Sequence, residues 1–177
     1  MLKTSPSPFL QCPLCKKVHG VRTGNRPLTG SMIHQVENSS LPGFEDSGTI
    51  SICFHFQSGL QGPEHPSPGQ PYIADGFPRV AYLPDTPNGC RALHGLYFAW
   101  EQRLLFTVGT SMSSGFSNRV TWNDIHLKTQ KIGSEHGYPD PNFLANLMQE
   151  LAGFGITEAE IGAHMTAHPN LRTRGKL

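Results

Sequence analysis

Strict alternation of apolar and polar residues between Thr49 and Phe56 limits the folds open to this chain more than any other stretch. It reads TISICFHF, with isoleucine or phenylalanine at every second position and Ser51, Cys53 and His55 between them. Because successive side chains of a β-strand point to opposite faces, this pattern predicts a strand with one apolar face. Such half-buried strands are typical of antiparallel sheets. We therefore expect an antiparallel sheet, with His55 on the face away from the core.

Glycine and proline occur along the whole chain and argue against a helical bundle. The 177 residues include 19 glycines and 15 prolines, which predicts many turns and short elements. The proline-rich stretch 61–71 cannot lie inside a sheet, so we expect an extended loop there. Further short strands are predicted at 31–37, 77–83, 104–108 and 119–122.

Helical spacing of apolar residues is clear in two places. Between 89 and 103 four large apolar side chains recur on one helical face, namely Leu93, Leu96, Tyr97 and Trp100. Asp140 as the N-cap and Pro141 at the first helical position predict the start of a second helix, which ends near Gly153. Thr157 and Glu160 have the spacing of a capping box for a short third helix. The expected fold class is α+β: mainly antiparallel strands, two main helices and a short C-terminal helix.

Charge and hydropathy argue against two classes of partner. The formal net charge is +1 and no basic stripe is present, so we expect no sequence-specific binding to nucleic acid. No apolar run approaches the roughly 20 residues of a membrane helix, and the N-terminus lacks the apolar segment of a signal peptide. Four cysteines then favour reduced thiols or metal ligands over disulfides. We expect a protein of the cytoplasm or the nucleus, with no membrane partner.

Two of the four cysteines have the spacing of a zinc knuckle. Cys12 and Cys15 form C-x2-C, and His19 follows four residues later, which predicts half of a tetrahedral zinc site. Zinc needs about four ligands, and Cys53 and Cys90 fall in a predicted strand and a predicted helix, so neither is a natural partner. The prediction is a partial zinc site in an N-terminal arm; the alternative is two free surface cysteines.

The stretch 106–141 is the predicted functional site, because it gathers glycines, polar residues and histidines between two apolar elements. Loops held by a rigid scaffold are where binding groups concentrate. Glu150 follows at the margin of the apolar face of the second predicted helix. A carboxylate there is partly shielded from water and suits a general base; the alternative is a boundary glutamate directed to solvent.

Six motifs, in order along the chain, carry a resemblance to a known family. They are SLPG (40–43), GPEHPSPG (62–69), YLPD (82–85), QRLLFTVGTS (102–111), TWNDIHLKT (121–129) and GYPDPNFL (137–144). In this order and spacing, residues 24–157 resemble the C-terminal domain of the Deltex family of RING-type ubiquitin ligases. The CPLC motif resembles the last cysteine pair of the RING finger that precedes this domain. Where the family often has two consecutive histidines, this chain has His126 followed by Leu127.

The resemblance also implies how the chain is divided. Residues 1–23 would be a remnant of the RING finger and a linker, 24–160 a single Deltex C-terminal domain, and 161–177 a tail. No cysteine precedes Cys12, so the first six RING ligands are absent from this chain. We expect a fragment, a truncated product or a paralogue that has lost most of its RING finger, and zinc only at the partial site.

By resemblance, the domain binds NAD⁺ or ADP-ribose in a cleft. Together with the RING finger it would support ubiquitin transfer, ADP-ribosylation of ubiquitin, and transfer of ubiquitin to ADP-ribosylated acceptors. The implied NAD or ADP-ribose contacts are Thr110, Ser111, Trp122, His126, His136 and Tyr138. His136 and Glu150 would be the catalytic pair, and Trp122 and Tyr138 would stack on the adenine or nicotinamide ring.

The resemblance further implies the partners. These are ubiquitin, an E2 ubiquitin-conjugating enzyme where a RING finger is supplied, ADP-ribosylated acceptors and, through the family name alone, Notch-pathway proteins. The expected activity is that of a Deltex-type E3 ubiquitin-protein ligase. The alternative is a non-catalytic module that binds ADP-ribose, because most of the RING finger is missing from this chain.

Overall fold

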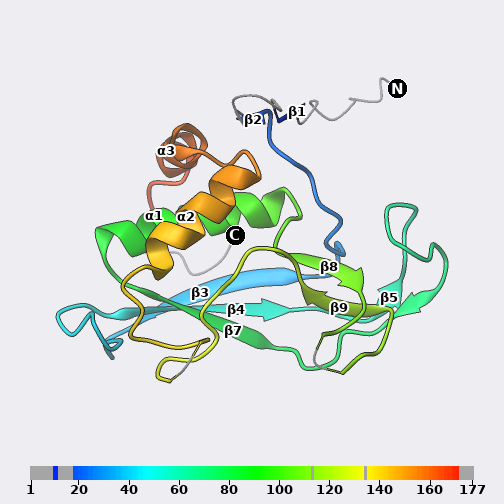
Figure 1. Cartoon of the computed structure of the whole chain (residues 1–177), viewed down its shortest axis with the longest axis horizontal. Helices are drawn as coiled ribbons and strands as arrows, with labels where there is room; N and C mark the ends of the chain where they lie inside the picture. Colours follow the sequence, from blue (N-terminus) through cyan, green and yellow to red (C-terminus); the bar gives the residue numbers. More distant parts are fainter. Residues whose placement is uncertain (1–9, 12–17, 113, 134, 172–177) are drawn as a thin grey trace.

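A three-stranded antiparallel sheet and a layer of helices form the body of the protein (Figure 1). The computed structural model describes residues 10–11, 18–112, 114–133 and 135–171. The predicted zinc knuckle at Cys12 and Cys15 lies outside these residues. In the part of the chain that is described, no helix is both long and apolar enough to span a membrane.

The predicted central strand is confirmed as β4 (Thr49–His55), which pairs with β3 (Ser31–Glu37) on one side and β7 (Arg79–Pro84) on the other. The alternation places the apolar residues of β4 in the core and leaves His55 exposed. Ser51, on the other face of β4, is also buried, and its hydroxyl donates a hydrogen bond to the Glu37 carboxylate on β3. The sheet is antiparallel throughout, as predicted.

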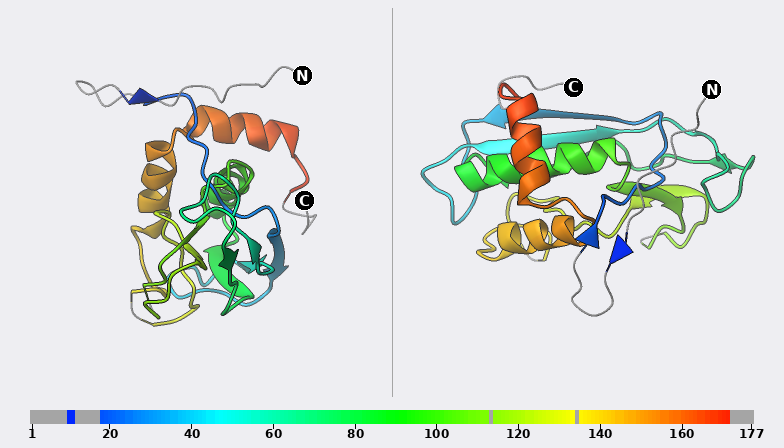
Figure 2. Two further views of the ribbon diagram at one scale, coloured as in Figure 1. Left: turned by 90° about the vertical axis from the view of Figure 1, so that its right-hand side faces the viewer. Right: turned by 90° about the horizontal axis from the view of Figure 1, so that it is seen from above.

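Helix α1 (Pro87–Glu101) is the central helix of the fold. Its start is capped by Thr86, whose Oγ1 accepts a hydrogen bond from the Gly89 amide at 3.1 Å. It packs against β7 and, through other parts of its surface, against α2 (Phe143–Gly153) and α3 (Glu158–Ala167) (Figure 2). A Cβ added at Gly95 would lie 2.7 Å from Leu151 Cδ1 and 3.2 Å from Ile161 Cδ1. The missing side chain at Gly95 therefore lets both helices approach α1 closely.

The second helix begins two residues later than predicted. Asn142 occupies the N-cap position of α2 without a side-chain cap, whereas Asp140 and Pro141 precede the helix. Asp140 is engaged elsewhere: its carboxylate pairs with Lys128 Nζ at 2.7 Å and accepts from the Asn142 amide at 3.1 Å. The capping box of α3, formed by Thr157 and Glu160, is present as predicted, and this helix extends past residue 160 to Ala167.

A two-stranded ladder, β8 (Phe106–Gly109) with β9 (Arg119–Trp122), packs on the sheet through aromatic rings. Phe106 is fully buried, with its ring 4.3 Å from that of Trp122 and 5.1 Å from that of Phe54 on β4. Burial of one such ring stabilises a fold by roughly 1.5–3 kcal/mol. This cluster fixes the end of β9, from which the chain enters the candidate site.

Two small strand pairs complete the structure. β5 (Gly59–Leu60) pairs with β6 (Pro71–Tyr72), and the proline-rich stretch between them is a loop, as predicted. β1 (Leu10–Gln11) pairs with β2 (Val18–His19) near the N-terminus.

Candidate functional site

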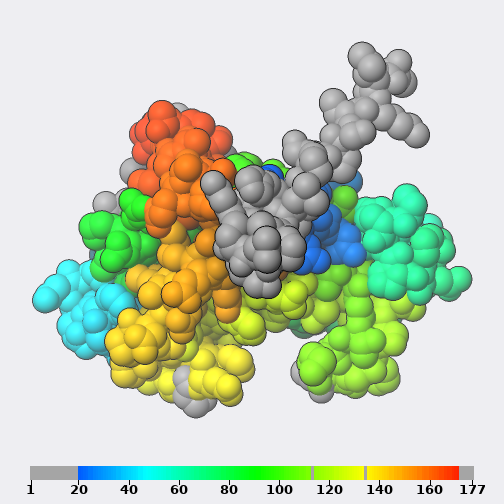
Figure 3. All heavy atoms as spheres, turned by 45° about the horizontal axis from the view of Figure 1, so that its top comes forward, coloured from blue at the N-terminus to red at the C-terminus, as the bar shows by residue number. Residues whose placement is uncertain are grey.

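A cleft of about 430 Å³ opens between α2 and the segment that follows β9. Figure 3 shows these two parts of the chain, in orange and yellow, meeting on one face of the molecule. Pockets for small organic ligands usually have volumes of about 300–1,000 Å³. The apolar residues that line it are Trp122, Ile125, Leu127, Phe143 and Leu147. The polar ones are Asn123, His126, Lys128, Thr129, Glu135, His136, Asp140, Asn146 and Glu150.

The segment after β9 alternates between the core and the cleft. Asn123 anchors its start, because its backbone amide donates to Leu105 O at 3.1 Å and its side-chain amide donates to Leu104 O at 2.9 Å. Ile125 and Leu127 are then buried, so His126 between them points outward. The imidazole of His126 is 83% exposed and lies at the mouth of the cleft.

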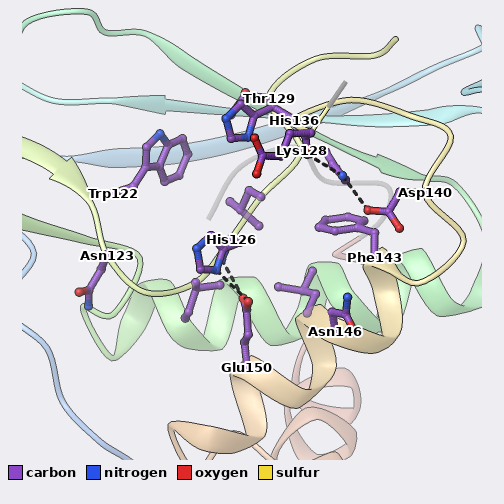
Figure 4. Close-up of a pocket in the computed structure, with 14 residues that line it drawn as sticks. Trp122, Asn123, His126, Lys128, Thr129, His136, Asp140, Phe143, Asn146 and Glu150 are labelled. Atoms are coloured by element: carbon purple, nitrogen blue, oxygen red, sulfur yellow. Dashed lines mark hydrogen bonds and ion pairs between the residues drawn. The ribbon is translucent and has the colours of Figure 1, made fainter. Parts of the chain in front are cut away.

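Glu150 holds His126 through two hydrogen bonds (Figure 4). One carboxylate oxygen accepts from the His126 backbone amide at 2.8 Å, and the other contacts the imidazole Nδ1 at 2.8 Å. Because a carboxylate only accepts, Nδ1 carries the proton of this bond. The neutral imidazole therefore has its lone pair on Nε2. Glu150 itself is only 29% exposed, since it projects from α2 beside the buried Leu147 and Leu151.

An ion pair between the buried Lys128 and the partly exposed Asp140 forms the other end of the cleft. Lys128 is 7% exposed; its ammonium pairs with Asp140 at 2.7 Å and donates to Glu135 O at 2.8 Å. The same ammonium lies 5.6 Å from the centre of the Phe143 ring. The hydrogen bond from Lys128 lowers the pKa of the Asp140 carboxyl below its ordinary value. These contacts join the segment after β9 to the loop before α2.

The loop 129–139 forms the rim on which His136 lies. Its two arms are joined by a hydrogen bond from the Gln130 amide to His136 O at 2.9 Å. Gly137 sits where the arms touch: an added Cβ would lie 2.8 Å from Gly133 N and from Ile132 C. His136 is exposed, and Figure 4 shows it near Lys128, across the cleft from Glu150.

Of the predicted site residues, the structure brings four together in this cleft: Trp122, His126, His136 and Glu150. It pairs Glu150 with His126, and among the described residues no hydrogen bond joins Glu150 to His136. One face of the Trp122 indole is covered by Phe106, stacked at an angle of 25°. The catalytic role expected of His136 and Glu150 stays a prediction.

Thr110 and Ser111 lie away from this group. The ladder pairs Trp122 with Phe106 at one end and Arg119 with Gly109 at the other. Three residues of strand span about 10 Å, so the loop that begins at Thr110 leaves from the opposite end to the cleft. Ser111 is buried and its backbone closes the loop, with its amide donating to Phe116 O at 2.9 Å. Neither residue lines the cleft.

Tyr138 is part of the core rather than of the cleft wall. Its side chain is fully buried, and its hydroxyl donates to Tyr82 O on β7 at 2.9 Å. Phe44 and Phe143 pack edge-on against its ring. Burial raises the pKa of the Tyr138 hydroxyl well above its ordinary value. In this structure the ring of Tyr138 has no free face on which a nucleotide base could stack.

Sequence reasoning missed Lys128 and misassigned Asp140. A signal was present for Lys128, because it lies two residues after His126 in an extended segment and so falls on the same side of the chain. Asp140 has the residue type and spacing of an N-cap, and the sequence alone does not show that it lies close enough to Lys128 to form an ion pair.

The family comparison decides the assignment of this domain. The model of the Deltex C-terminal domain matches residues 23–156, which include β3 to β9 and all of α2. The chain belongs to the Deltex family. The cleft, with its His126–Glu150 pair, therefore lies within the Deltex domain, whereas α3 follows the matched residues.

Several Deltex proteins are similar enough to this chain in sequence to support its assignment to the family. The chain is 51% identical over 152 residues to the E3 ubiquitin-protein ligase DTX1 of Xenopus laevis, and 49% identical over 152 residues to DTX4 of Mus musculus. It is 46% identical over 150 residues to the probable E3 ubiquitin-protein ligase DTX3 of Homo sapiens. These alignments cover 83–84% of the chain, but 24% of the first two relatives and 43% of the third. The chain thus spans a quarter to under half the length of these proteins.

Proposed function

We propose that this Deltex domain is the nucleotide-binding and catalytic part of an E3 ubiquitin-protein ligase. It binds NAD⁺ or ADP-ribose in the cleft beside α2. With a RING finger and an E2, it directs ubiquitin onto ADP-ribosylated acceptors or ADP-ribosylates ubiquitin itself. The observation that carries this proposal is the His126–Glu150 pair, set at the mouth of a cleft with an apolar floor.

The cleft suits a nucleotide sugar in both shape and chemistry. Trp122 and Phe143 offer aromatic surface, and Asn146 and the two imidazoles offer hydrogen-bonding groups at the rim. The buried ammonium of Lys128 is already paired with Asp140, so we assign it to holding the cleft together rather than to phosphate. In this arrangement donors for ribose and phosphate oxygens come from His136 and the Asn146 amide, whereas Nε2 of neutral His126 accepts a hydrogen bond.

Ubiquitin transfer needs a base near the attacking hydroxyl. In this reaction a hydroxyl oxygen of the ADP-ribosylated acceptor attacks the carbonyl carbon of the E2–ubiquitin thioester. The new C–O bond forms as the C–S bond breaks, and the E2 cysteine leaves as a thiolate. His126 Nε2 accepts the hydroxyl proton, while Glu150 fixes the tautomer and stabilises the resulting imidazolium. This assigns the base to His126 and the positioning role to Glu150.

ADP-ribosylation of ubiquitin uses the same cleft with NAD⁺ as substrate. The C-terminal carboxylate of ubiquitin attacks the anomeric carbon of the nicotinamide ribose. A C–O bond forms, the C–N bond to nicotinamide breaks, and nicotinamide leaves with the bonding electrons. No proton has to be removed from the carboxylate. This reaction therefore depends on how the cleft orients NAD⁺ more than on a base at His126.

Calorimetric titration with ADP-ribose and NAD⁺ tests the binding part of the proposal. We expect saturable 1:1 binding that His136→Ala and Trp122→Ala weaken by at least tenfold. His55→Ala is the matched control, because His55 is an exposed histidine outside the cleft. Absence of binding, or equal binding by all variants, would refute a nucleotide site in this cleft.

Reconstitution with E1, E2, ubiquitin and a RING finger tests the catalytic part. We expect His126→Ala to reduce transfer to an ADP-ribosylated peptide by about 10²–10⁴, the usual contribution of a positioned base, while NAD⁺-dependent modification of ubiquitin falls much less. If the domain binds ADP-ribose but transfers nothing with any RING finger supplied, it is a binding module and the catalytic proposal is wrong.

A further inference from the structure

A second group of chemically active side chains lies where α3 crosses α1 (Figure 2). Glu101 at the end of α1, His164 on α3 and His168 directly after α3 offer one carboxylate oxygen and two imidazole nitrogens as possible metal ligands. These atoms all lie within 4.8 Å of one another. His164 is 5% exposed, His168 is half-buried and Glu101 is exposed, so the group can be reached from solvent. None of these residues lines the cleft beside α2.

The buried member of the group has a nitrogen without a hydrogen-bond partner. His164 Nε2 is buried and makes no hydrogen bond; its nearest charged neighbour is the Glu101 carboxylate at 3.8 Å. Buried polar atoms of native proteins nearly always have a partner, and an unpaired one calls for an explanation such as a missing ion. A metal ion placed between these side chains would supply that partner.

The other nitrogen of His164 is already held as a metal ligand requires. Its Nδ1 lies 3.0 Å from Nδ1 of His94 on α1, so one of the two nitrogens carries a proton and the other accepts it. If His164 donates, its Nε2 is left with a lone pair directed toward Glu101. Ligating histidines regularly donate their second nitrogen to a neighbouring acceptor in this way.

We propose that Glu101, His164 and His168 form a zinc-binding site, with His94 as its outer-shell partner. Two imidazoles and one carboxylate are a ligand set that Zn²⁺ uses, with water in the fourth position. Tetrahedral coordination at about 2.0–2.1 Å places ligand atoms roughly 3.3 Å apart. The exposed Glu101 and the half-buried His168 reach this spacing by rotation of their side chains, while the buried His164 stays in place.

The bound ion would join the end of α3 to α1. Both histidine ligands lie beyond residue 156, where the Deltex family match ends, so the site extends the family domain by one helix. Zinc at this place would stabilise the folded state by RT ln(1 + c/Kd), where c is the concentration of free Zn²⁺, because the unfolded chain does not assemble the three ligands. The site is independent of the nucleotide cleft, and its test does not depend on that proposal.

The test measures zinc binding to the full chain with Cys12→Ser and Cys15→Ser, which removes the predicted N-terminal knuckle. We expect one Zn²⁺ per chain by calorimetry, an unfolding midpoint raised by several degrees in ZnCl₂ but not in MgCl₂, and visible d–d absorption of four- or five-coordinate Co²⁺. No binding by this chain would overturn the proposal.

Variants then locate the ion. His168→Ala and Glu101→Ala each remove one ligand and should lower zinc affinity by more than about 100-fold, whereas His94→Phe should lower it by roughly 10–100-fold, as outer-shell losses do. The matched controls are His126→Ala, which breaks the other histidine–glutamate pair, and His55→Ala, next to the Cys53 thiol. Circular dichroism confirms that each variant is folded. Loss of binding in a control, or full binding in both ligand variants, would overturn the assignment.

Discussion

Removal of a single hydroxyl, in Tyr138→Phe, separates a structural role for this tyrosine from a role in ligand binding. The hydroxyl is buried and donates to the Tyr82 carbonyl at 2.9 Å. Phenylalanine keeps the ring contacts but leaves that carbonyl without this donor. A buried hydrogen bond contributes about 0.5–1.5 kcal/mol, and an acceptor left unpaired costs about 1–3 kcal/mol. We expect the free energy of unfolding to fall by about 1–2 kcal/mol.

The assay has two parts that must agree. Thermal unfolding should show a midpoint lowered by about 2–8 °C, using about 2–4 °C per kcal/mol for a domain of this size. Titration with ADP-ribose should give an affinity within about twofold of the original chain. Tyr72→Phe is the matched control, because its hydroxyl also forms a hydrogen bond, to Thr29 at 2.9 Å, outside the cleft. An ADP-ribose affinity lowered tenfold with unchanged stability would refute the core assignment of Tyr138.

Three further predictions concern the cleft. Glu150→Gln replaces one carboxylate oxygen with an amide NH₂ group, so the side chain cannot accept both hydrogen bonds from His126. Ubiquitin transfer in the reconstituted assay should fall at least tenfold, while the affinity for ADP-ribose stays nearly unchanged. An equal loss of transfer and of affinity would contradict a positioning role. In Gly137→Ala the added Cβ would lie 2.8 Å from backbone atoms of Ile132 and Gly133, so the free energy of unfolding should fall by about 1–3 kcal/mol and ADP-ribose binding should weaken. Gly162→Ala is the control, because its added Cβ has no atom within 4 Å, and it should cause neither loss. Because Lys128 lowers the folded-state pKa of Asp140 below 3.8, the stability from this pair is present above pH 3.8 and lost as pH falls below it. In Asp140→Asn the free energy of unfolding should lose this dependence on pH below 3.8. If the variant and the original chain lose stability equally as the pH falls, the contribution of the ion pair is contradicted.

The alternation in β4 and the helical stripe of α1 were readable from the sequence because each element buries one face. The start of α2 could not be predicted in the same way. Asp140 and Pro141 match the pattern of a helix start, but Asp140 forms an ion pair with Lys128 from another segment and does not cap the helix. The hydrogen bonds of Glu150 to His126 were not predicted, for a related reason. Sequence spacing shows that a carboxylate lies near the apolar margin of a helix, but which of two histidines it meets depends on how α2 docks against the segment after β9.

The His126–Glu150 pair joins two parts of the chain that reach the core by separate routes. His126 follows a ladder fixed by aromatic stacking, whereas Glu150 precedes Leu151, which occupies the gap left by Gly95 on α1. The two hydrogen bonds therefore form only when both attachments are correct. NMR resonances of the His126 imidazole would therefore report on how α2 packs against α1. If α2 loosens from α1, these resonances should change before those of the sheet.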